Sequence, residues 1–368
     1  MALIGFHDLK DSALPSLWDE DYLKKVELED GTTFDEMVRL AQTALSALNA
    51  EILGMPGYSQ LFSVQDDAEV EYAVGVGNTF EEATEYGTPD PTRGKTTGHM
   101  LPIKPYDMAL GWTMMSLRKA RRAKLEADIR QMIVAGRALY QKALLTRFFT
   151  STANAVGSTS SDVPFADAGS ADANYVPPES PSGETFLYTH EHFLDTSDSG
   201  ITSTTFDNSC LSVAVEHLQE HGYDGPYMAI CSRTDIGSWA AVDGFKPPTW
   251  SGVNYQQSAV ERAQFGDIRQ YFGAVETDYG LINLWATPRL ATQNFGVVPL
   301  GLPESERPLR MRIAPRIGFG INLVPGNWIN APALLVVAYA EFGIGVGNRV
   351  GGVAVDLGAG TWAAPTIS

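Results

Sequence analysis

The chain has 368 residues, of which 44% are hydrophobic, and its formal net charge is -18 at pH 7. This length and apolar content exclude wholesale disorder, and no apolar run approaches the roughly 20 residues that a membrane-spanning helix needs. The two cysteines, Cys210 and Cys231, are too few for a disulfide framework or a four-cysteine zinc site, and we expect buried thiols in a reducing compartment.

The first elements in chain order are an acidic arm and a helix. Residues 1–31 show little periodicity, which indicates an extended arm, and they lack the basic and apolar regions of a secretory signal. Residues 32–54, TTFDEMVRLAQTALSALNAEILG, then show helical features, with acids in the first turn. Thr32 or Thr33 can serve as the cap and Gly54 as the stop.

Residues 58–108 change to the alternation that is typical of strands. The segment VEYAVGV alternates apolar and polar side chains, and the stretch TEYGTPDPTRGKTTGH is rich in Gly, Pro and Thr. The pattern predicts a long two-stranded projection with a polar tip. Because an isolated hairpin is only marginally stable in water, we expect this projection to lie on another surface.

The next segment concentrates the positive charge of the chain. Between Ser116 and Thr150 there are nine Lys or Arg and two acids, whereas residues 1–90 contain 19 acids and four bases. Helical spacing without proline predicts one helix over residues 116–149, about 50 Å long. Five of the cations fall in RKARRAK, residues 118–124, where the helix dipole disfavours them unless an anion lies nearby.

The second half of the chain combines a polar stretch, a helix and several strands. Residues 151–205 are rich in Ser, Thr, Gly and Asp, as in a linker or an insertion. A helix is predicted next, with Asp207 as its cap and Gly222 as its end. Gly-marked turns separate the strand-like segments PYMAICS, GLINLWA, FGVVPLG and PALLVVAYAEF. The Gly-rich residues 343–352 are interpreted as turns, because the Lys-Ser/Thr of a phosphate loop does not follow.

This order of elements resembles the major capsid proteins of tailed bacteriophages, whose shared fold is named after the Hong Kong 97 phage. The most specific piece is PYMAICSRTDIGSWAAV, which is similar to the strand and Asp-led helix near the start of the family's axial domain. The resemblance implies an α+β fold with an N-terminal arm, an extended loop, a peripheral domain with a long spine helix, and an axial domain. The implied boundaries are 1–57 for the arm and first helix, 58–110 for the extended loop, 111–205 for the peripheral domain with spine helix and polar insertion, 206–308 for the axial domain, and 309–368 for the return to the peripheral domain and the C-terminus.

The resemblance also implies a structural protein and not an enzyme. Such a protein self-assembles through pentamers and hexamers into an icosahedral head that encloses double-stranded DNA, without a cofactor and without a membrane. Scaffold, portal and decoration proteins are further partners in this family, and packaged DNA is contacted without sequence specificity. The expected location is the virion, after assembly in the host cytoplasm. An encapsulin-like bacterial compartment of the same fold is the alternative.

The basic cluster is expected to meet an anionic partner. It consists of Arg118, Lys119, Arg121, Arg122 and Lys124. A lumen lined by so acidic a chain would on average repel DNA, so we favour pairing with acids of residues 1–90 at subunit contacts over contact with the genome. The candidate partners include Asp66, Asp67, Glu69, Glu71, Glu81, Glu82 and Glu85. The tip of the extended loop carries Arg93 and Lys95.

A competing chemistry is suggested by the stretch HLQEH. It fits the H-x-x-E-H pattern of zinc peptidases, with His217 and His221 as ligands and Glu220 as general base. His190 and His192 precede it. We favour the interpretation that His217 and His221 are solvated residues in the last turn of a short helix, where cations suit the dipole. A zinc hydrolase is the alternative from a different class of protein.

Overall fold

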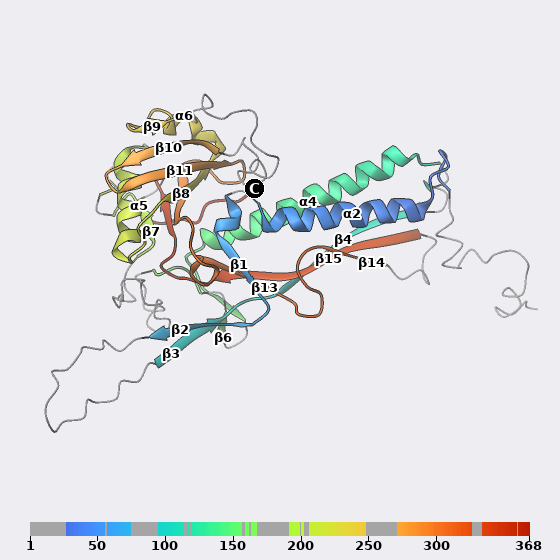
Figure 1. Ribbon diagram of the computed structural model, residues 1–368, viewed down its shortest axis with the longest axis horizontal. Coiled ribbons are helices and arrows are strands. Elements are labelled where there is room, and N and C mark those ends of the chain that lie inside the picture. Colours follow the sequence, from blue (N-terminus) through green and yellow to red (C-terminus); the bar gives the residue numbers. More distant parts are fainter. Residues whose placement is uncertain are drawn as a thin grey trace, which may run out of the picture. The chain divides into compact units, whose positions relative to one another are not determined.

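The computed structural model describes most of the chain in separate stretches (Figure 1). These are residues 27–55, 57–74, 95–113, 116–117, 119–156, 159–161, 163–167, 191–198, 200–201, 206–247, 271–325, 333–358 and 360–368. Most of the predicted arm, the tip of the predicted loop and much of the polar insertion lie outside them. The chain divides into two compact units, which we describe separately. The first is Met1–Leu53, Lys104–Leu139 and Arg316–Glu341, and the second is Gly54–Ile103, Tyr140–Pro315 and Phe342–Ser368.

Helix α2 of the first unit spans Phe34–Leu53, as predicted. Thr33 and Glu36 form a capping box at its start. The backbone N–H of Glu36 donates to Thr33 Oγ1 at 3.4 Å, and the N–H of Thr33 donates to the Glu36 carboxylate at 3.0 Å. The buried residues recur three or four positions apart, so one face of the helix enters the core. They are Phe34, Met37, Ala41, Leu45, Leu48 and Ile52.

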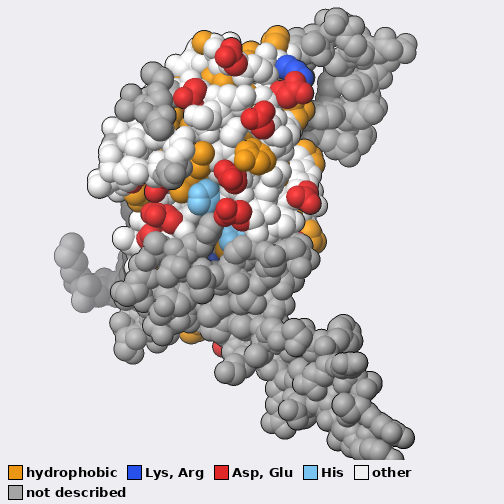
Figure 2. Space-filling model, turned by 90° about the vertical axis from the view of Figure 1, so that its left-hand side faces the viewer, with side chains coloured by type: hydrophobic (Ala, Val, Ile, Leu, Met, Phe, Trp, Pro, Cys, Tyr) orange, Lys and Arg blue, Asp and Glu red, His pale blue; other side chains and the backbone are white. Residues whose placement is uncertain are grey.

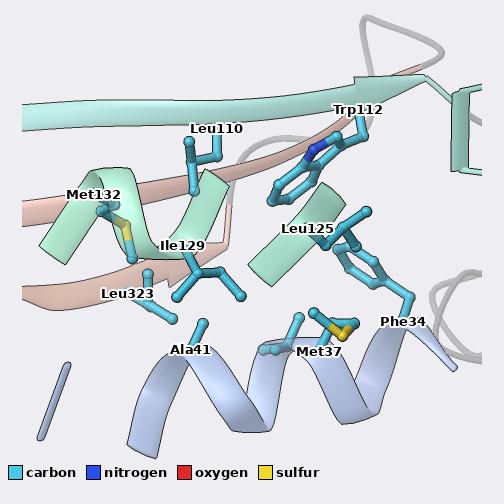
Figure 3. A pocket seen from close by; sticks show the side chains of 10 residues that line it. Phe34, Met37, Ala41, Leu110, Trp112, Leu125, Ile129, Met132 and Leu323 are labelled. Atoms are coloured by element: carbon cyan, nitrogen blue, oxygen red, sulfur yellow. The ribbon is translucent and has the colours of Figure 1, made fainter. Parts of the chain in front are cut away.

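The core of the first unit brings together α2, strands β4 (Lys104–Thr113) and β14 (Asn322–Pro325), and the first part of helix α4 (Arg122–Phe148). Figure 3 shows their apolar side chains around a small cavity. The rings of Phe34 and Trp112 meet edge to face, with centroids 6.0 Å apart. The indole N–H of Trp112 donates to the carboxylate of Asp128 at 2.9 Å, so its polar atom is satisfied. Strand β15 (Ala333–Val346) pairs with both β14 and β4.

Helix α4 spans Arg122–Phe148, so the prediction of one helix from residue 116 is wrong at its start. Residues 119–121 are not helical. The carbonyl of Ala120 accepts from the backbone N–H of Glu29 at 3.0 Å, and the N–H of Arg122 donates to the Asp30 carboxylate at 2.8 Å. An acid therefore satisfies one of the free N–H groups at the helix start. The 27-residue helix is about 40 Å long instead of about 50 Å.

The second unit contains a seven-stranded mixed sheet with the strand order β7-β16-β12-β8-β11-β10-β9. Its central strand β8 pairs in parallel with β11 and antiparallel with β12, and both β8 and β12 are buried along their whole length. The predicted strand segments of this region are confirmed. The bounds are β7 Phe193–Asp195, β8 Tyr227–Ser232, β9 Phe245–Lys246, β10 Tyr271–Thr277, β11 Gly280–Thr287, β12 Asn294–Pro299 and β16 Val353–Asp356.

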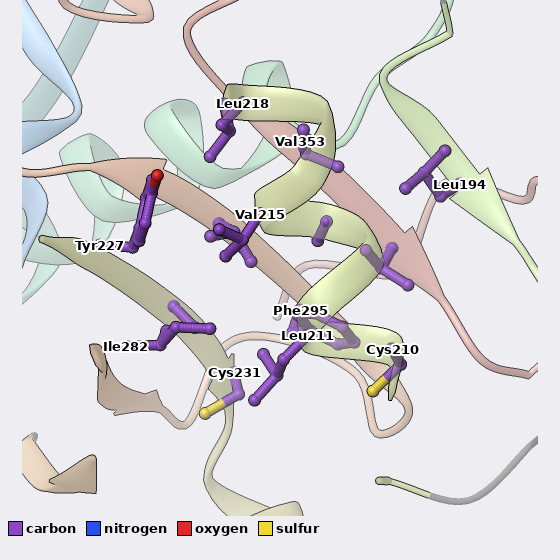
Figure 4. Close-up of a cluster of buried hydrophobic side chains, with 14 of the residues drawn as sticks. Leu194, Cys210, Leu211, Val215, Leu218, Tyr227, Cys231, Ile282, Phe295 and Val353 are labelled. Carbon is purple, nitrogen blue, oxygen red and sulfur yellow. The ribbon is translucent and has the colours of Figure 1, made fainter. Parts of the chain in front are cut away.

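Helix α5 (Asn208–Glu220) covers one face of this sheet (Figure 4). Asp207 caps it by accepting from the N–H of Cys210 at 3.0 Å, and Gly222 follows its end with a φ of 80°, both as predicted. Apolar side chains of α5 pack against those of the sheet in one cluster. Among them are Leu211, Val215, Leu218, Tyr227, Ile282, Phe295 and Val353. Burial of each large aliphatic side chain contributes about 2 kcal/mol.

The predicted two-stranded projection begins with β2 (Glu69–Val74) and β3 (Lys95–Met100), which pair antiparallel from Glu69↔Met100 to Val74↔Lys95. The turn between them lies outside the described residues. Strand β3 also pairs with β6, in a four-stranded sheet. The remaining elements are β1 Phe62–Gln65, β5 Asn154–Val156, β6 Thr159–Ser161, β13 Leu309–Ile313, α6 Ile236–Trp239, and the 3-10 helices η1 Tyr58–Gln60, η3 Arg233–Asp235 and η5 Glu304–Glu306.

Candidate functional site

The basic cluster lies at the start of α4, beside a turn at residues 28–32. The N–H of Leu28 donates to the carbonyl of Thr32 at 2.9 Å, and Gly31 adopts a φ of 80° that favours glycine. This turn presents Asp30 to the helix start. The hydrogen bond from the backbone of Arg122 lowers the pKa of the Asp30 carboxyl below its ordinary value. The carboxylate therefore remains charged where the helix dipole favours an anion.

Two guanidinium groups of the cluster form ion pairs. Arg121 Nε lies 3.2 Å from the Glu29 carboxylate, and Arg122 Nε lies 2.6 Å from that of Glu126, one helical turn further on. The hydrogen bond to Glu29 raises the pKa of Arg121, and the hydrogen bond to Glu126 raises that of Arg122. The Arg121 and Glu29 side chains are 73% and 51% exposed, so water and salt screen this pair.

The lysines of the cluster remain available for other partners. Lys119 and Lys124 are exposed, and neither forms an ion pair with another described residue. Arg118 lies outside the described residues. Further along α4, Arg130 and Lys142 are also exposed. The positive charge of this region therefore exceeds what the nearby acids of the described chain neutralise.

The predicted acidic partners occupy a different part of the chain. Asp66, Asp67, Glu69 and Glu71 are exposed at the base of the β2–β3 projection, which belongs to the second unit. Glu81, Glu82, Glu85 and Arg93 lie outside the described residues, and only the backbone of Lys95 is described, as the first residue of β3. Three acids contact the cluster: Glu29 and Asp30, which lie within the predicted range 1–90 although they were not named individually, and Glu126 of α4. The signal for Glu29 and Asp30 was the acidic run ELED, residues 27–30, shortly before the capping Thr33.

The histidines of the second unit differ from the sequence interpretation. His221 ends α5 but is fully buried, so the prediction that it is solvated is wrong. Its Nε2 lies 2.8 Å from Nε2 of His192, which is also fully buried. His217 is partly buried, with its ring centroid 6.1 Å from that of His192. The reason for the error is that the burying partner comes from a segment 29 residues earlier, outside the helix pattern.

The zinc hypothesis gains no support from this arrangement. Across the described residues, no group of three or more His, Cys, Asp or Glu side chains is placed to hold a metal ion. Glu220, the proposed general base, has a raised pKa because of partial burial and the nearby Glu216. His190 lies outside the described residues.

No described helix is long and apolar enough to cross a lipid bilayer.

Comparison with known proteins gives structural matches only. No protein-family model matches the sequence, and no match is found among curated proteins. A solved structure from Mycobacterium phage Patience is similar over 94% of this chain and 94% of its own, with a TM-score of 0.63 and 18% sequence identity. The chain has the Hong Kong 97 capsid fold. The predicted α+β fold class is thereby confirmed.

Other structures with weaker similarity to this Hong Kong 97-type chain come from shells of two kinds. The mature capsid of bacteriophage PhiM1 matches 82% of this chain and 86% of its own at 12% identity, with a TM-score of 0.45. The holo-SrpI encapsulin complex from Synechococcus elongatus matches 82% of this chain and 84% of its own at 10% identity, also with a TM-score of 0.45.

Proposed function

We propose that this chain is the major capsid protein of a tailed bacteriophage, assembling through pentamers and hexamers into an icosahedral head around double-stranded DNA. The observation that carries the proposal is the similarity of fold over 94% of both chains to a structure from a phage. Because one fold can serve several functions, an encapsulin-like compartment is the alternative. The two differ in what the shell encloses.

The proposed subdivision follows the predicted boundaries. Residues 58–110 would form the extended loop, which agrees with the antiparallel pairing of β2 and β3. Residues 111–205 would form the peripheral domain with α4 as its spine helix, and residues 206–308 the axial domain with α5 and strands β8 to β12. Residues 1–57 would supply the arm and 309–368 the return to the peripheral domain.

A structural role agrees with the chemistry of the two thiols. Burial raises the pKa of Cys210 to about 12 and that of Cys231 well above its ordinary value. A thiol that stays protonated at neutral pH is a poor nucleophile. Both side chains belong to the apolar cluster between α5 and the sheet. They therefore contribute to packing and not to catalysis.

The test of assembly is expression of the full chain, followed by light scattering and negative-stain electron microscopy. We expect closed shells, or pentamers and hexamers that convert to shells. A compact and thermally stable monomer at high concentration would refute the proposal. Nuclease-protected double-stranded DNA in native particles would support a phage head, whereas one abundant enclosed protein would support the compartment.

We further propose that the basic cluster contacts acids of neighbouring subunits. The support is charge: Lys119 and Lys124 are exposed without an ion pair to any described residue, in a chain of net charge -18. The variant Lys119→Glu/Lys124→Glu tests this without touching the pairs of Arg121 and Arg122. We expect it to impair formation of empty shells, most at low salt, where exposed charges interact over longer distances.

The matched control is Arg233→Glu/Arg316→Glu, which reverses two other exposed cations. We expect this control to assemble normally, and Arg121→Glu/Arg122→Glu to be impaired like the lysine variant. Circular dichroism of each variant establishes that α4 still forms. If empty shells of both cluster variants assemble normally and only DNA retention falls, the cluster faces the genome and the intersubunit role is wrong.

A further inference from the structure

Two buried histidines join three segments of the second unit that are distant in sequence. His192 directly precedes β7, and His221 is the residue at the end of α5. Their Nε2 atoms are 2.8 Å apart, and their rings stack with centroids 4.8 Å apart and an interplanar angle of 28°. On its other side, His192 Nδ1 lies 2.9 Å from the carbonyl oxygen of Gly352, in the turn before β16.

These contacts determine where the protons lie. A carbonyl oxygen can only accept, so Nδ1 of His192 must carry a proton and donate it to Gly352. When the His192 ring is neutral, its Nε2 carries no proton and accepts a hydrogen bond from Nε2–H of His221. The pair can bind one extra proton and still keep a single N–H···N bond between the rings. A second extra proton would place two N–H groups and two positive charges against each other.

The pair fastens an edge strand to the body of the sheet. Strand β7 is the edge of the seven-stranded sheet and pairs there with β16. The backbone of His192 donates to the carbonyl of Ala166 at 2.8 Å and accepts from the N–H of Ala354 at 2.9 Å. Ala166 in turn donates to the carbonyl of Arg349 at 3.0 Å. Opening the imidazole contact would therefore loosen residues 191–195 and 163–167 first.

Each element beside the pair carries ionisable groups. Glu191 precedes His192, and its pKa is raised to about 7 by burial and by the negative charges of Asp198, Asp167 and Asp195. Helix α5 contributes His217 and Glu220, and strand β16 contributes Asp356. The turn at residues 347–352 contributes the fully buried Arg349, whose Nε donates to the carbonyl of Pro164 at 3.0 Å. Figure 2 shows acidic side chains and histidine together on one exposed face.

We propose that His192 and His221 form a proton-responsive latch that holds β7 closed when both rings are neutral and releases it when both are protonated. The released segment binds more protons than the latched one, so the equilibrium moves toward release as the pH falls. The carboxylates nearby can compensate the first imidazolium. Glu191 becomes protonated, and so loses its negative charge, from about pH 7 downward. The negative charge that balances an imidazolium therefore decreases in the pH range where imidazole, whose ordinary pKa is about 6.5, takes up protons.

The latch depends on the geometry of the second unit and not on the proposed capsid function. Its test is hydrogen–deuterium exchange of the full chain at pH 7.5 and 5.5, corrected for the intrinsic pH dependence of exchange. Each extra proton bound by the open form changes the opening equilibrium about tenfold per pH unit. We therefore expect peptides covering 191–195 and 163–167 to lose protection by about tenfold or more, while peptides of β8 and β12 keep theirs.

The variant His221→Gln cannot be protonated, and we expect it to lose most of this pH dependence. His217→Gln is the matched control, because its ring lies on the same helix without joining the Nε2–Nε2 contact, and the dependence should persist. Equal loss of protection in all peptides of the wild-type chain, or none, would overturn the proposal. So would an unchanged pH dependence in His221→Gln. If residues 191–195 of His221→Gln are already unprotected at pH 7.5, exchange of His192→Gln is measured in the same way. A persistent pH dependence of exchange at residues 163–167 in His192→Gln would overturn the proposal.

Discussion

Replacing Asp235 with alanine removes a carboxylate that joins two distant turns of the second unit. Asp235 is 4% exposed, at the start of α6. It accepts from the backbone N–H of Gln293 at 2.8 Å and from the hydroxyl of Thr292. Gln293 has a φ of 65°, a left-handed conformation that costs a residue with a side chain about 1–2 kcal/mol. The carboxylate thus holds an unfavourable turn in place.

The expected loss follows from these contacts. A hydrogen bond to a charged acceptor contributes about 1.5–3 kcal/mol, and Asp235→Ala loses those from Gln293 and Thr292 together with a longer one, of 3.4 Å, from the Thr234 hydroxyl. Allowing for water that reaches the partly exposed turn, we expect the free energy of unfolding to fall by about 3 kcal/mol. Asp235→Asn keeps one acceptor oxygen and should lose about half as much. Denaturant unfolding of the unassembled chain measures both values.

A second substitution tests whether Asp235 acts through the left-handed turn. Gln293→Gly removes the conformational cost of the held turn, so it should stabilise the wild-type chain by about 1 kcal/mol and the Asp235→Ala chain by less, because the turn is no longer held there. Hydrogen–deuterium exchange of residues 290–299 should follow the same order. A stability of Asp235→Ala within about 0.5 kcal/mol of wild type, or an equal effect of Gln293→Gly in both backgrounds, would contradict this role of Asp235.

Two further predictions concern packing and pH. In Gly296→Ala the new Cβ would lie 2.3 Å from Cε1 of Phe148, so the free energy of unfolding should fall by about 1–3 kcal/mol, as measured by thermal or denaturant unfolding. The control is Gly237→Ala, whose Cβ meets nothing within 4 Å and which should keep the wild-type stability. Burial lowers the pKa of His99 to about 4, so between pH 6.5 and 4 the unfolded chain binds a proton that the folded chain does not. Stability should fall over that range by about 3 kcal/mol from this residue, and unfolding curves of His99→Gln should lack that contribution; an identical pH dependence in the variant would contradict the assignment.

Elements whose signals are local were predictable from the sequence. The cap of α2 depends on Thr33 and Glu36, three residues apart, and the cap of α5 on Asp207 and Cys210. Both helices begin where the sequence indicates. The strands of the sheet were also recognisable, since β8 and β12 are short, continuous apolar runs between turn residues.

Features that depend on distant partners were not predictable. The start of α4 is set by Asp30, which is 92 residues before Arg122. Asp235 does begin α6 as expected, yet its side chain makes no cap bond and reaches Gln293, 58 residues away. In the candidate site, charge segregation identified the basic cluster, but composition could not show which acids lie beside it. Tertiary contact decides that choice.

The position of β7 in the sequence determines when this strand can pair during synthesis of the chain. Among the described residues β7 finds its sheet partner only in β16, and His192 is separated from Gly352 by 160 residues. At translation rates of roughly 5–20 residues per second, the edge strand waits on the order of ten seconds for its partner to leave the ribosome. During that time the edge of β16 does not yet exist, and residues 193–195 cannot pair there. The sheet can therefore be completed at its β7 edge only after β16 has been synthesised.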